Sequence, residues 1–275
     1  MLVDSQVHVW RAIPGHPNPA VTITSPASDI PLELYNQYMS EYGIERAVLV
    51  QPVYPGQDNT YVAECASSDP SKFKAVCVVD PRLPGAVRRL EYWVAKRGCV
   101  GLRLRPRIAD EALCFGDSST FPLWEKAQTL RVVVSILASP SQFRTIGMLA
   151  ARFPLVPIVI DHMGHPDVRP GVESADLKDL LALSQHNKIY AKVSGYYYFS
   201  RCSYPFEDCW NVFRALYDAF GPERLVWGSD FPHVLLKIGF RRNLLLQERI
   251  YSYLSQSELA LIMGNNAEEL YWPSG

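Results

Sequence analysis

The sequence lacks the features of an exported, membrane-spanning or nucleic-acid-binding chain. Its six cysteines include no C-x-x-C pair, and no uninterrupted apolar run approaches the roughly 18 residues of a membrane-spanning helix. Met1 leads directly into residues 2–10 without a basic flank or a small-residue cleavage site. A formal net charge of −1 leaves no excess of positive charge to attract nucleic acid or an acidic membrane. We therefore expect a cytoplasmic protein without nucleic-acid or membrane partners, either monomeric or oligomeric.

The chain also has no glycine-rich phosphate loop after any of its apolar segments. Those segments are short and rich in β-branched residues, which is typical of parallel strands covered on both faces. Eight of them recur along the chain, at 2–10, 46–53, 74–80, 99–106, 132–138, 157–164, 188–195 and 224–230.

Amphipathic segments lie between the predicted strands. Residues 31–43, 85–98 and 206–221 carry apolar side chains at helical spacing and end in glycine, and capping boxes begin at Ser139 and Ser255. Strand and helix alternating eight times predict an α/β fold, a (β/α)8 TIM barrel formed by residues 1–275 as a single domain. An open, doubly wound sheet is the competing topology. The longest irregular loop is expected from Arg11 to Ser28.

Polar side chains stand at or near the ends of six predicted strands, where this fold places its active site. Alternate spacing predicts that the polar residues of the first strand share one face, as do those of the fourth. These polar residues are Asp4, Gln6 and His8 on the first strand, Asp80 on the third, Arg103 and Arg105 on the fourth, Asp161 and His162 on the sixth, Lys192 and Ser194 on the seventh, and Ser229, Asp230 and His233 at the eighth.

Each of these residues alone has an ordinary structural explanation. A single histidine at a strand end is more often a hydrogen-bonded structural residue, and either arginine could belong to an internal ion pair. Taken together, however, His8, His162 and Asp230 form a plausible set for activating water.

Several motifs make the chain resemble the amidohydrolase-related family of TIM-barrel hydrolases. The family typically shows D-x-H-x-H-x-W, G-x-R, I-D-H-x-G-x-P, K-x-S-G, W-G-S-D-x-P and a closing G-x-N-A-x-x-L-Y. The corresponding segments here are Asp4–Trp10, Gly101–Arg103, Ile160–Pro166, Lys192–Gly195, Trp227–Pro232 and Gly264–Tyr271. The resemblance extends from about residue 3 to residue 272, and it implies a fold of the metal-dependent-hydrolase type.

Within that superfamily the chain is most similar to the lactonase branch, which includes 2-pyrone-4,6-dicarboxylate lactonase, the sugar-acid lactonases and sulfomuconolactonase. Decarboxylase and hydratase members usually carry a further catalytic histidine where this chain has Lys192 and Ser194. The resemblance thus implies a hydrolase of carboxylic ester bonds that opens the lactone of a carboxylate-bearing small molecule. A decarboxylase or hydratase on the same scaffold and a non-catalytic small-molecule-binding barrel are the alternatives.

One departure from the family pattern affects the expected cofactor. Gln6 stands where the first histidine of the H-x-H pair usually stands, and an amide oxygen is a poor zinc ligand. We therefore expect either no cofactor or a weakly bound divalent metal ion, zinc being the first candidate. Its ligands would be His8, His162 and Asp230.

The expected mechanism assigns a role to each group. Asp230 is the candidate base for the attacking water, while His8 and His162 would stabilise the oxyanion. The residues expected to bind substrate are Gln6, Arg103, Arg105, Lys192, Ser194 and His233, with the three cations holding a substrate carboxylate. Some of the aromatic residues 196–199 are expected to wall the pocket.

Overall fold

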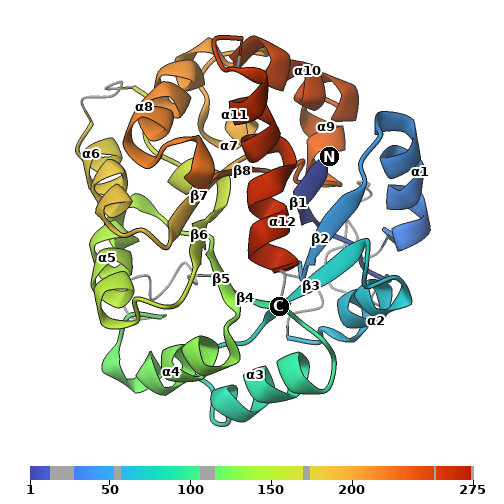
Figure 1. Ribbon diagram of the computed structural model, residues 1–275, viewed down its shortest axis with the longest axis vertical. Coiled ribbons are helices and arrows are strands. Elements are labelled where there is room, and N and C mark those ends of the chain that lie inside the picture. The colour runs from blue at the N-terminus through green and yellow to red at the C-terminus, as the bar shows by residue number, and fades with distance from the viewer. Residues whose placement is uncertain (13–27, 53–56, 106–114, 170–173, 251, 274–275) are drawn as a thin grey trace.

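The computed structural model of the chain describes residues 1–12, 28–52, 57–105, 115–169, 174–250 and 252–273. Eight strands form one parallel sheet in sequential order, with helices around it (Figure 1). The strands are β1 (Val3–Val7), β2 (Arg46–Val50), β3 (Phe73–Val78), β4 (Gly101–Leu104), β5 (Val133–Ile136), β6 (Ile158–Ile160), β7 (Ile189–Val193) and β8 (Leu225–Trp227). The first and last strands meet where the Asp230 N–H donates to the Gln6 carbonyl at 2.9 Å and the His8 N–H donates to the Phe231 carbonyl at 2.7 Å. The expected TIM barrel is confirmed, and the open sheet is not formed.

Among the described residues, one α-helix follows each of the first six strands, two follow β7 and four follow β8. They are α1 (Leu32–Tyr42), α2 (Thr60–Ser68), α3 (Ala86–Ala95), α4 (Phe121–Leu130), α5 (Phe143–Arg152), α6 (Ala175–Ala182), α7 (Tyr196–Phe199), α8 (Trp210–Phe220), α9 (His233–Lys237), α10 (Phe240–Ile250), α11 (Gln256–Ala260) and α12 (Asn266–Tyr271). The three predicted amphipathic segments are α1, α3 and α8, and both predicted capping boxes are present. Among the described residues, no helix is long and apolar enough to cross a membrane.

Most strands end earlier than the sequence pattern predicts. His162 and Asp230 have φ angles of 51° and 61°, in the left-handed region that ends an extended strand. As a result, the polar residues after β6 and β8 belong to tight turns rather than to the strands themselves. The predicted loop from Arg11 to Ser28 and the last residues of the second and fourth predicted strands lie largely outside the described residues.

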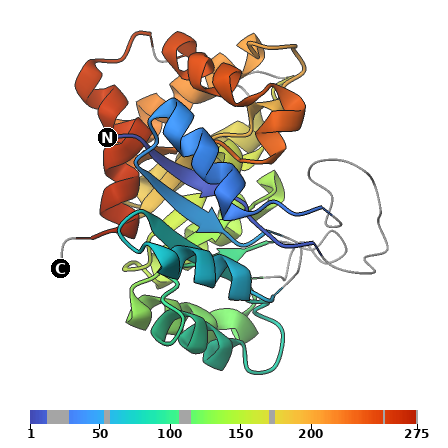
Figure 2. The same ribbon diagram turned by 90° about the vertical axis from the view of Figure 1, so that its right-hand side faces the viewer.

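At the end where the strands begin, the interior of the barrel is filled by a cluster of valines, and the C-terminal helix α12 packs against this cluster. Its members are Val3, Val48, Val50, Val76, Val133, Val159 and Val226, packed with Ala267 and Tyr271 of α12. Figure 2 shows α12 on the side from which the strands start, next to the N-terminus. Because this end is sealed, polar side chains carried further along the strands lie toward the opposite mouth.

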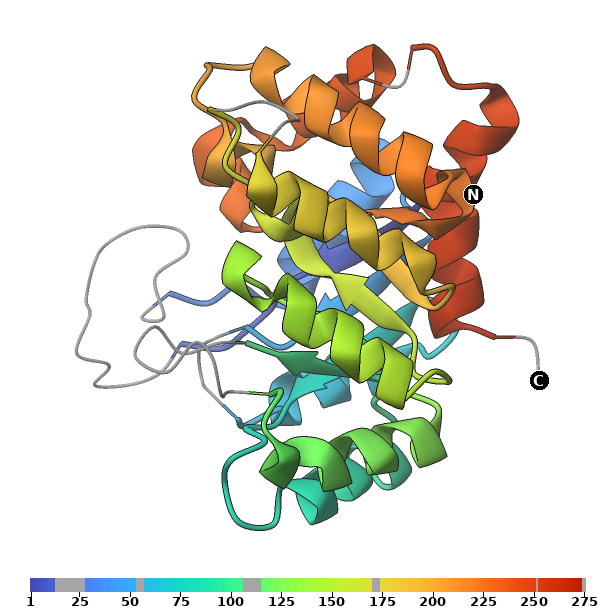
Figure 3. The ribbon, with the colours of Figure 1, turned by 90° about the vertical axis from the view of Figure 1, so that its left-hand side faces the viewer.

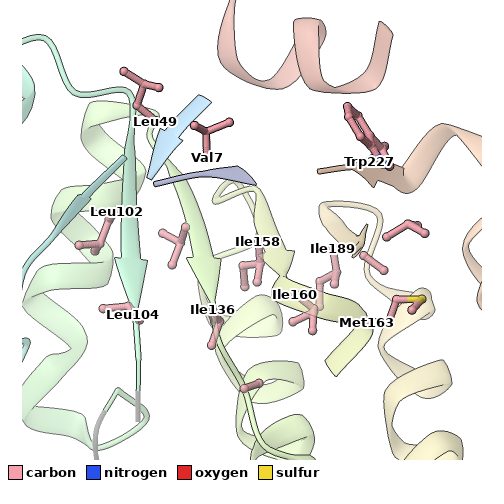
Figure 4. Close-up of a cluster of buried hydrophobic side chains, with 14 of the residues drawn as sticks. Val7, Leu49, Leu102, Leu104, Ile136, Ile158, Ile160, Met163, Ile189 and Trp227 are labelled. Carbon is pink, nitrogen blue, oxygen red and sulfur yellow. The ribbon is translucent and has the colours of Figure 1, made fainter. Parts of the chain in front are cut away.

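The larger apolar cluster lies between the strands and the surrounding helices. Figure 3 shows helices covering the outside of the sheet, and Figure 4 shows strand side chains such as Leu102, Ile136 and Ile160 from this cluster. These positions alternate with inward-facing ones along each strand. The outer cluster therefore holds the strands in place, while the inner face of the barrel carries the valine cluster at one end and the site residues at the other.

The first strand contradicts the expectation that Asp4 shares a face with Gln6 and His8. The β1–β2 register shifts between Asp4 and Val7, where β1 contains one residue more than β2. This bulge changes the side to which the following residues point. Asp4 accepts a 2.9 Å hydrogen bond from Tyr35 of α1, outside the barrel. Gln6 instead bonds inward to Lys192 of β7.

Candidate active site

A pocket of about 300 Å³ lies at the carboxyl ends of the strands. Its lining residues come from the end of β4 and from the segments that follow seven of the eight strands, which is where a barrel of this kind gathers functional groups. They are His8, Trp10, Pro52, Arg103, Arg105, Leu137, His162, His165, Tyr198, Asp230 and His233.

Asp230 is the carboxylate of this pocket, and its two oxygens have different surroundings. Oδ2 accepts hydrogen bonds from the Tyr197 hydroxyl at 2.7 Å and from the Tyr198 hydroxyl at 2.8 Å. Oδ1 has no hydrogen-bond partner among the described residues, and lies 3.5 Å from His8 Nε2 and 3.8 Å from His162 Nε2. Burial raises the pKa of Asp230, but His162 and His8 more than offset this, so the pKa lies below its usual value. Asp230 is thus an ionised carboxylate whose Oδ2 is fixed by two tyrosine hydroxyls and whose Oδ1 can accept a hydrogen bond from a ligand or a water molecule.

A chain of hydrogen bonds from Lys192 through Gln6 determines which ring nitrogen of His8 carries the hydrogen. The Lys192 ammonium donates to Gln6 Oε1 at 2.6 Å, so the amide nitrogen of Gln6 faces His8 Nε2 at 3.2 Å. The Gln6 amide can only donate there, which makes His8 Nε2 the acceptor. His8 Nδ1 then carries the hydrogen and donates it to the Val50 carbonyl at 2.7 Å.

Beneath the pocket, two cations share the carboxylate of Asp161. Arg103 Nε donates to Asp161 Oδ2 at 3.0 Å, and Lys192 Nζ lies 3.0 Å from Asp161 Oδ1. Asp161 and Lys192 are fully buried. Burial raises the pKa of Asp161, but Lys192 and Arg103 outweigh it and hold that pKa below its usual value. Burial lowers the pKa of Lys192, and the neighbouring Asp161 opposes that shift, so one carboxylate stabilises the two basic side chains beside it.

His162 is held by the two residues that follow β7. Its Nδ1 lies 2.8 Å from Ser194 Oγ, and a Cβ at Gly195 would lie 2.7 Å from the same nitrogen. Gly195, which has a φ of +67°, is therefore the residue that lets the ring lie against this turn. Burial lowers the pKa of His162 to about 3 despite Asp230 and Asp161, so the imidazole is neutral at neutral pH.

Three further groups lie around the mouth. His233 packs edge-on against His8 with ring centroids 5.5 Å apart, and burial lowers the pKa of His233 to about 4. His165 stacks on His162 at 5.4 Å. Arg105 is exposed and lines the pocket directly after β4, the strand that carries the buried Arg103. The mouth of the pocket thus carries two imidazole rings and a guanidinium group.

The structure brings most of the predicted residues together but divides them into two layers. His8, Arg103, Arg105, His162, Asp230 and His233 line the pocket, while Gln6, Lys192 and Ser194 lie behind them. Lys192 is fully buried, and its contacts are internal rather than directed at a ligand. Asp80, at the end of β3, pairs with Arg82 and is not among the lining residues.

The sequence analysis did not predict His165 as a site residue, and it predicted no catalytic contact for Tyr197 or Tyr198. His165 follows His162 within the matched I-D-H-x-G-x-P motif, and that position was a usable signal. Tyr197 and Tyr198 were expected at most as pocket walls, and their shared contact with Asp230 depends on how α7 turns after β7. No pattern in the sequence indicates that contact.

The residues proposed as metal ligands do not fit a divalent ion. The His8 Nε2 lone pair is already directed at the Gln6 amide, and the Gln6 oxygen is taken by Lys192. Within the described part of the chain, no group of three or more His, Cys, Asp or Glu side chains is arranged to hold a metal ion.

Comparison with known proteins identifies the family. The amidohydrolase family model matches residues 3–272, and the chain belongs to this family of enzymes. It is 26% identical over 233 residues to 4-sulfomuconolactone hydrolase of Hydrogenophaga intermedia, covering 84% of this chain and 74% of that protein. It is 25% identical over 283 residues to 2-pyrone-4,6-dicarboxylate hydrolase of Comamonas testosteroni, covering 98% and 90%. Both relatives confirm the predicted resemblance to the lactonase branch.

A solved structure supports the same fold. An amidohydrolase from Burkholderia multivorans with bound zinc superposes with a TM-score of 0.84 at 23% identity, covering 99% of each chain. The TIM-barrel architecture of this chain is therefore that of a known amidohydrolase.

Proposed function

We propose that this protein hydrolyses the lactone of a carboxylate-bearing small molecule, with Asp230 as the base that activates water. The observation that carries this proposal is the asymmetry of the Asp230 carboxylate. Two tyrosine hydroxyls hold Oδ2, whereas Oδ1 lies at the pocket wall without a hydrogen-bond partner among the described residues. A base that is fixed through one oxygen presents the other to a water molecule in a defined direction.

The reaction needs one proton to be accepted and later returned. A water bound at Asp230 Oδ1 attacks the lactone carbonyl carbon while its proton passes to Oδ1, and the carbonyl electron pair moves onto oxygen. When that pair returns, the bond to the ring oxygen breaks and the ring oxygen takes a proton from Asp230. The product is the open-chain hydroxy acid, and Asp230 is again ionised.

Two lining groups are placed to stabilise the oxyanion. With Ser194 Oγ donating to His162 Nδ1, His162 Nε2 carries the hydrogen and can donate to the developing charge. Arg103 adds a guanidinium in the pocket wall. His8 differs from the sequence expectation, because its Nε2 accepts from Gln6 and therefore does not donate to an oxyanion.

The substrate carboxylate is assigned to Arg105 rather than to Lys192. Arg105 lines the exposed mouth, and a guanidinium can bind a carboxylate through two parallel hydrogen bonds. The charge of Lys192 reaches the pocket only through space, because its ammonium is fully enclosed. The names of the two relatives, each a hydrolase of an acidic cyclic compound, support this choice.

The reaction is proposed to proceed without a divalent metal ion, because the donor set does not fit one. A lactone is an activated ester, so a positioned base and nitrogen donors are chemically sufficient.

A panel of five- and six-membered lactones, each with and without a carboxylate, tests the proposal. We expect carboxylated lactones to gain one water in mass and release acid, measured after extensive dialysis against chelator. Release of carbon dioxide from a carboxylated substrate would indicate the decarboxylase reaction instead. Binding without turnover across the panel would indicate a binding protein, and either result would overturn the assignment.

A further inference from the structure

Asp230, the proposed base, lies in a turn whose backbone conformation needs support. Its φ of 61° is in the left-handed region, which a residue other than glycine adopts when the surrounding structure enforces it. Asp230 also lies three residues beyond the end of β8, where an isolated bridge between Val7 and Phe231 continues the strand pairing. Contacts with the rest of the barrel therefore have to select the conformation of this turn.

Three successive backbone amides of the turn donate hydrogen bonds. The Ser229 N–H donates to Asp4 Oδ1 at 2.8 Å. The Asp230 N–H donates to the Gln6 carbonyl at 2.9 Å. The Phe231 N–H donates to Ser229 Oγ at 3.0 Å. The bond from Ser229 ends on a side chain of β1, so a substitution in β1 can remove it without altering the turn itself.

Asp4 is fixed by two further hydrogen bonds. It has no solvent exposure, its Oδ1 also accepts from the Gln6 N–H at 3.2 Å, and its Oδ2 accepts from the Tyr35 hydroxyl at 2.9 Å. Burial raises the pKa of Asp4 to about 6, while the bonds from Ser229, Tyr35 and Gln6 oppose that rise, so the carboxyl is ionised at pH 7.5. An ionised acceptor forms a stronger hydrogen bond than a neutral one. Asp4 thus joins β1 and α1 firmly to the turn after β8.

The end of β8 and the middle of β1 lie very close together at this point. A Cβ at Gly228 would lie 2.6 Å from the Gln6 Cβ and 3.0 Å from the Gln6 backbone nitrogen. The Ser5 hydroxyl donates to the Trp227 carbonyl at 2.6 Å. Because of this close approach, the short side chain of Asp4 can reach the turn directly.

We propose that Asp4 is a positioning residue for Asp230, which it holds in place through the backbone amide of Ser229. Tyr197 and Tyr198 of α7 fix the Asp230 carboxylate, and Asp4 of β1 fixes the backbone that carries it. Loss of the Asp4 contact lets the turn move, which displaces Oδ1 from the water and the carbonyl carbon. The effect on catalysis rests on the proposed lactone hydrolysis, whereas the effect on the turn does not.

Three single variants test the proposal. Asp4→Leu has a similar shape but accepts no hydrogen bond, whereas Asp4→Asn keeps an oxygen that can accept from Ser229. Tyr35→Phe is the matched control, because it removes the buried bond to Asp4 Oδ2 and leaves the bond from Ser229 to Oδ1. Urea unfolding of each variant gives its loss of stability and its folded fraction.

kcat and KM would be measured at pH 7.5 with a lactone that the wild type hydrolyses, and each rate would be referred to the folded fraction. We expect kcat of Asp4→Leu to fall by about 10–100-fold with little change in KM, because a reacting group displaced by about 1 Å can lose that factor. Asp4→Asn and Tyr35→Phe are expected to keep kcat close to the wild-type value.

A folded Asp4→Leu variant with normal kcat would overturn the proposal. So would an equal loss of kcat in Tyr35→Phe, since that loss would follow the damage to the core rather than the bond to Ser229. An Asp4→Asn variant as slow as Asp4→Leu would also contradict it, because asparagine retains the acceptor.

A second measurement does not depend on catalysis. Hydrogen exchange of the backbone amides, followed by NMR at pH 7, is expected to show Ser229 and Asp230 in the wild type as slow as the core strands. Exchange at these two positions should accelerate in Asp4→Leu but not in Tyr35→Phe. A rapidly exchanging Ser229 amide in the wild type would overturn the proposal even if Asp4→Leu did not fold. A wild type that opens no lactone would refute the proposed function, and hydrogen exchange would still decide whether Asp4 holds the turn.

Discussion

Arg103 and Asp161, which are 58 residues apart in the chain, are joined by a buried hydrogen bond of 3.0 Å between Nε and Oδ2. The bond links β4 to the turn after β6 across the interior of the barrel. Asp161 also neutralises Lys192, so one carboxylate stabilises two buried cations. The position of Arg103 in the pocket wall therefore depends on a residue that does not itself line the pocket.

Replacing Asp161 by asparagine should destabilise the fold. The variant leaves Lys192 and Arg103 without their shared anion, and breaking such a buried pair typically costs about 3–5 kcal/mol. Urea unfolding at neutral pH measures the loss. As a control, Asp218→Asn removes an exposed partner of Arg214 and should change little. Equal stability of the two variants would show that the buried cluster does not hold the barrel together.

Replacing Asp230 by asparagine should remove activity without unfolding the protein. An amide can still accept hydrogen bonds from Tyr197 and Tyr198, but it cannot take a proton from water. General-base catalysis typically contributes about 10²–10⁴-fold, and we expect the turnover rate to fall by that factor with little change in substrate binding. Single-turnover rates and the melting curve of the same preparation check this. A folded variant with normal turnover would exclude Asp230 as the base.

The double substitution Tyr197→Phe with Tyr198→Phe should lower the turnover rate, because the Asp230 carboxylate loses the two hydrogen bonds that fix its position. Burial and the nearby Asp230 raise the pKa of both tyrosines, so both phenols stay protonated and donate at neutral pH. Without them Oδ2 loses its two donors, and we expect kcat to fall by about 10–100-fold, in line with hydrogen bonds to a charged group.

The same double variant should also shift the pH–rate profile. Donors to a carboxylate stabilise its charged form, so their removal raises the pKa of Asp230 and moves the acid limb of kcat/KM to higher pH. Tyr92→Phe, at an exposed position on α3, is the matched control. A lower kcat with an unshifted acid limb would contradict the positioning role.

Arg105→Met should impair binding of carboxylated substrates selectively. Loss of a charge-assisted contact of about 1.5–3 kcal/mol corresponds to an increase in KM of roughly 10–100-fold. A neutral lactone of the same ring size should show an unchanged KM. Equal losses for charged and neutral substrates would mean that Arg105 shapes the mouth rather than binding the carboxylate.

Stability should fall as the pH is lowered, in part because of His162. Its pKa drops from 6.5 in the unfolded chain to about 3 in the fold, mainly through burial. Below pH 6.5 the unfolded chain takes up a proton that the folded chain refuses, so the stabilisation present above pH 6.5 is lost as the pH falls toward about 3. The contribution reaches at most about 1.4 kcal/mol per pH unit. Urea unfolding at pH 7.5 and pH 5, compared with His162→Gln, isolates it, and parallel losses in both proteins would refute the assignment.

The order of the eight strands, their alternation with helices and the end of the barrel that carries the polar groups could all be predicted from the sequence. These features depend on local patterns: apolar segments of strand length, helical spacing, capping boxes and glycine positions. The Trp227–Pro232 motif placed Asp230 at the mouth for the same reason, because its position follows directly from where β8 ends.

Which of those polar groups face the pocket, and which of their atoms donate or accept hydrogen bonds, depends on contacts that form only in the folded barrel. The bulge in β1 turned Asp4 outward and Gln6 inward, and one inserted residue in a strand pairing leaves no mark on a period-two pattern. The contact between Gln6 and Lys192 spans 186 residues, and the bonds of Tyr197 and Tyr198 to Asp230 span 33 and 32. Hydrogen-bond direction at such contacts is set by the donors and acceptors that the closed barrel brings within 3 Å or so of each other, and no local preference of the chain encodes it.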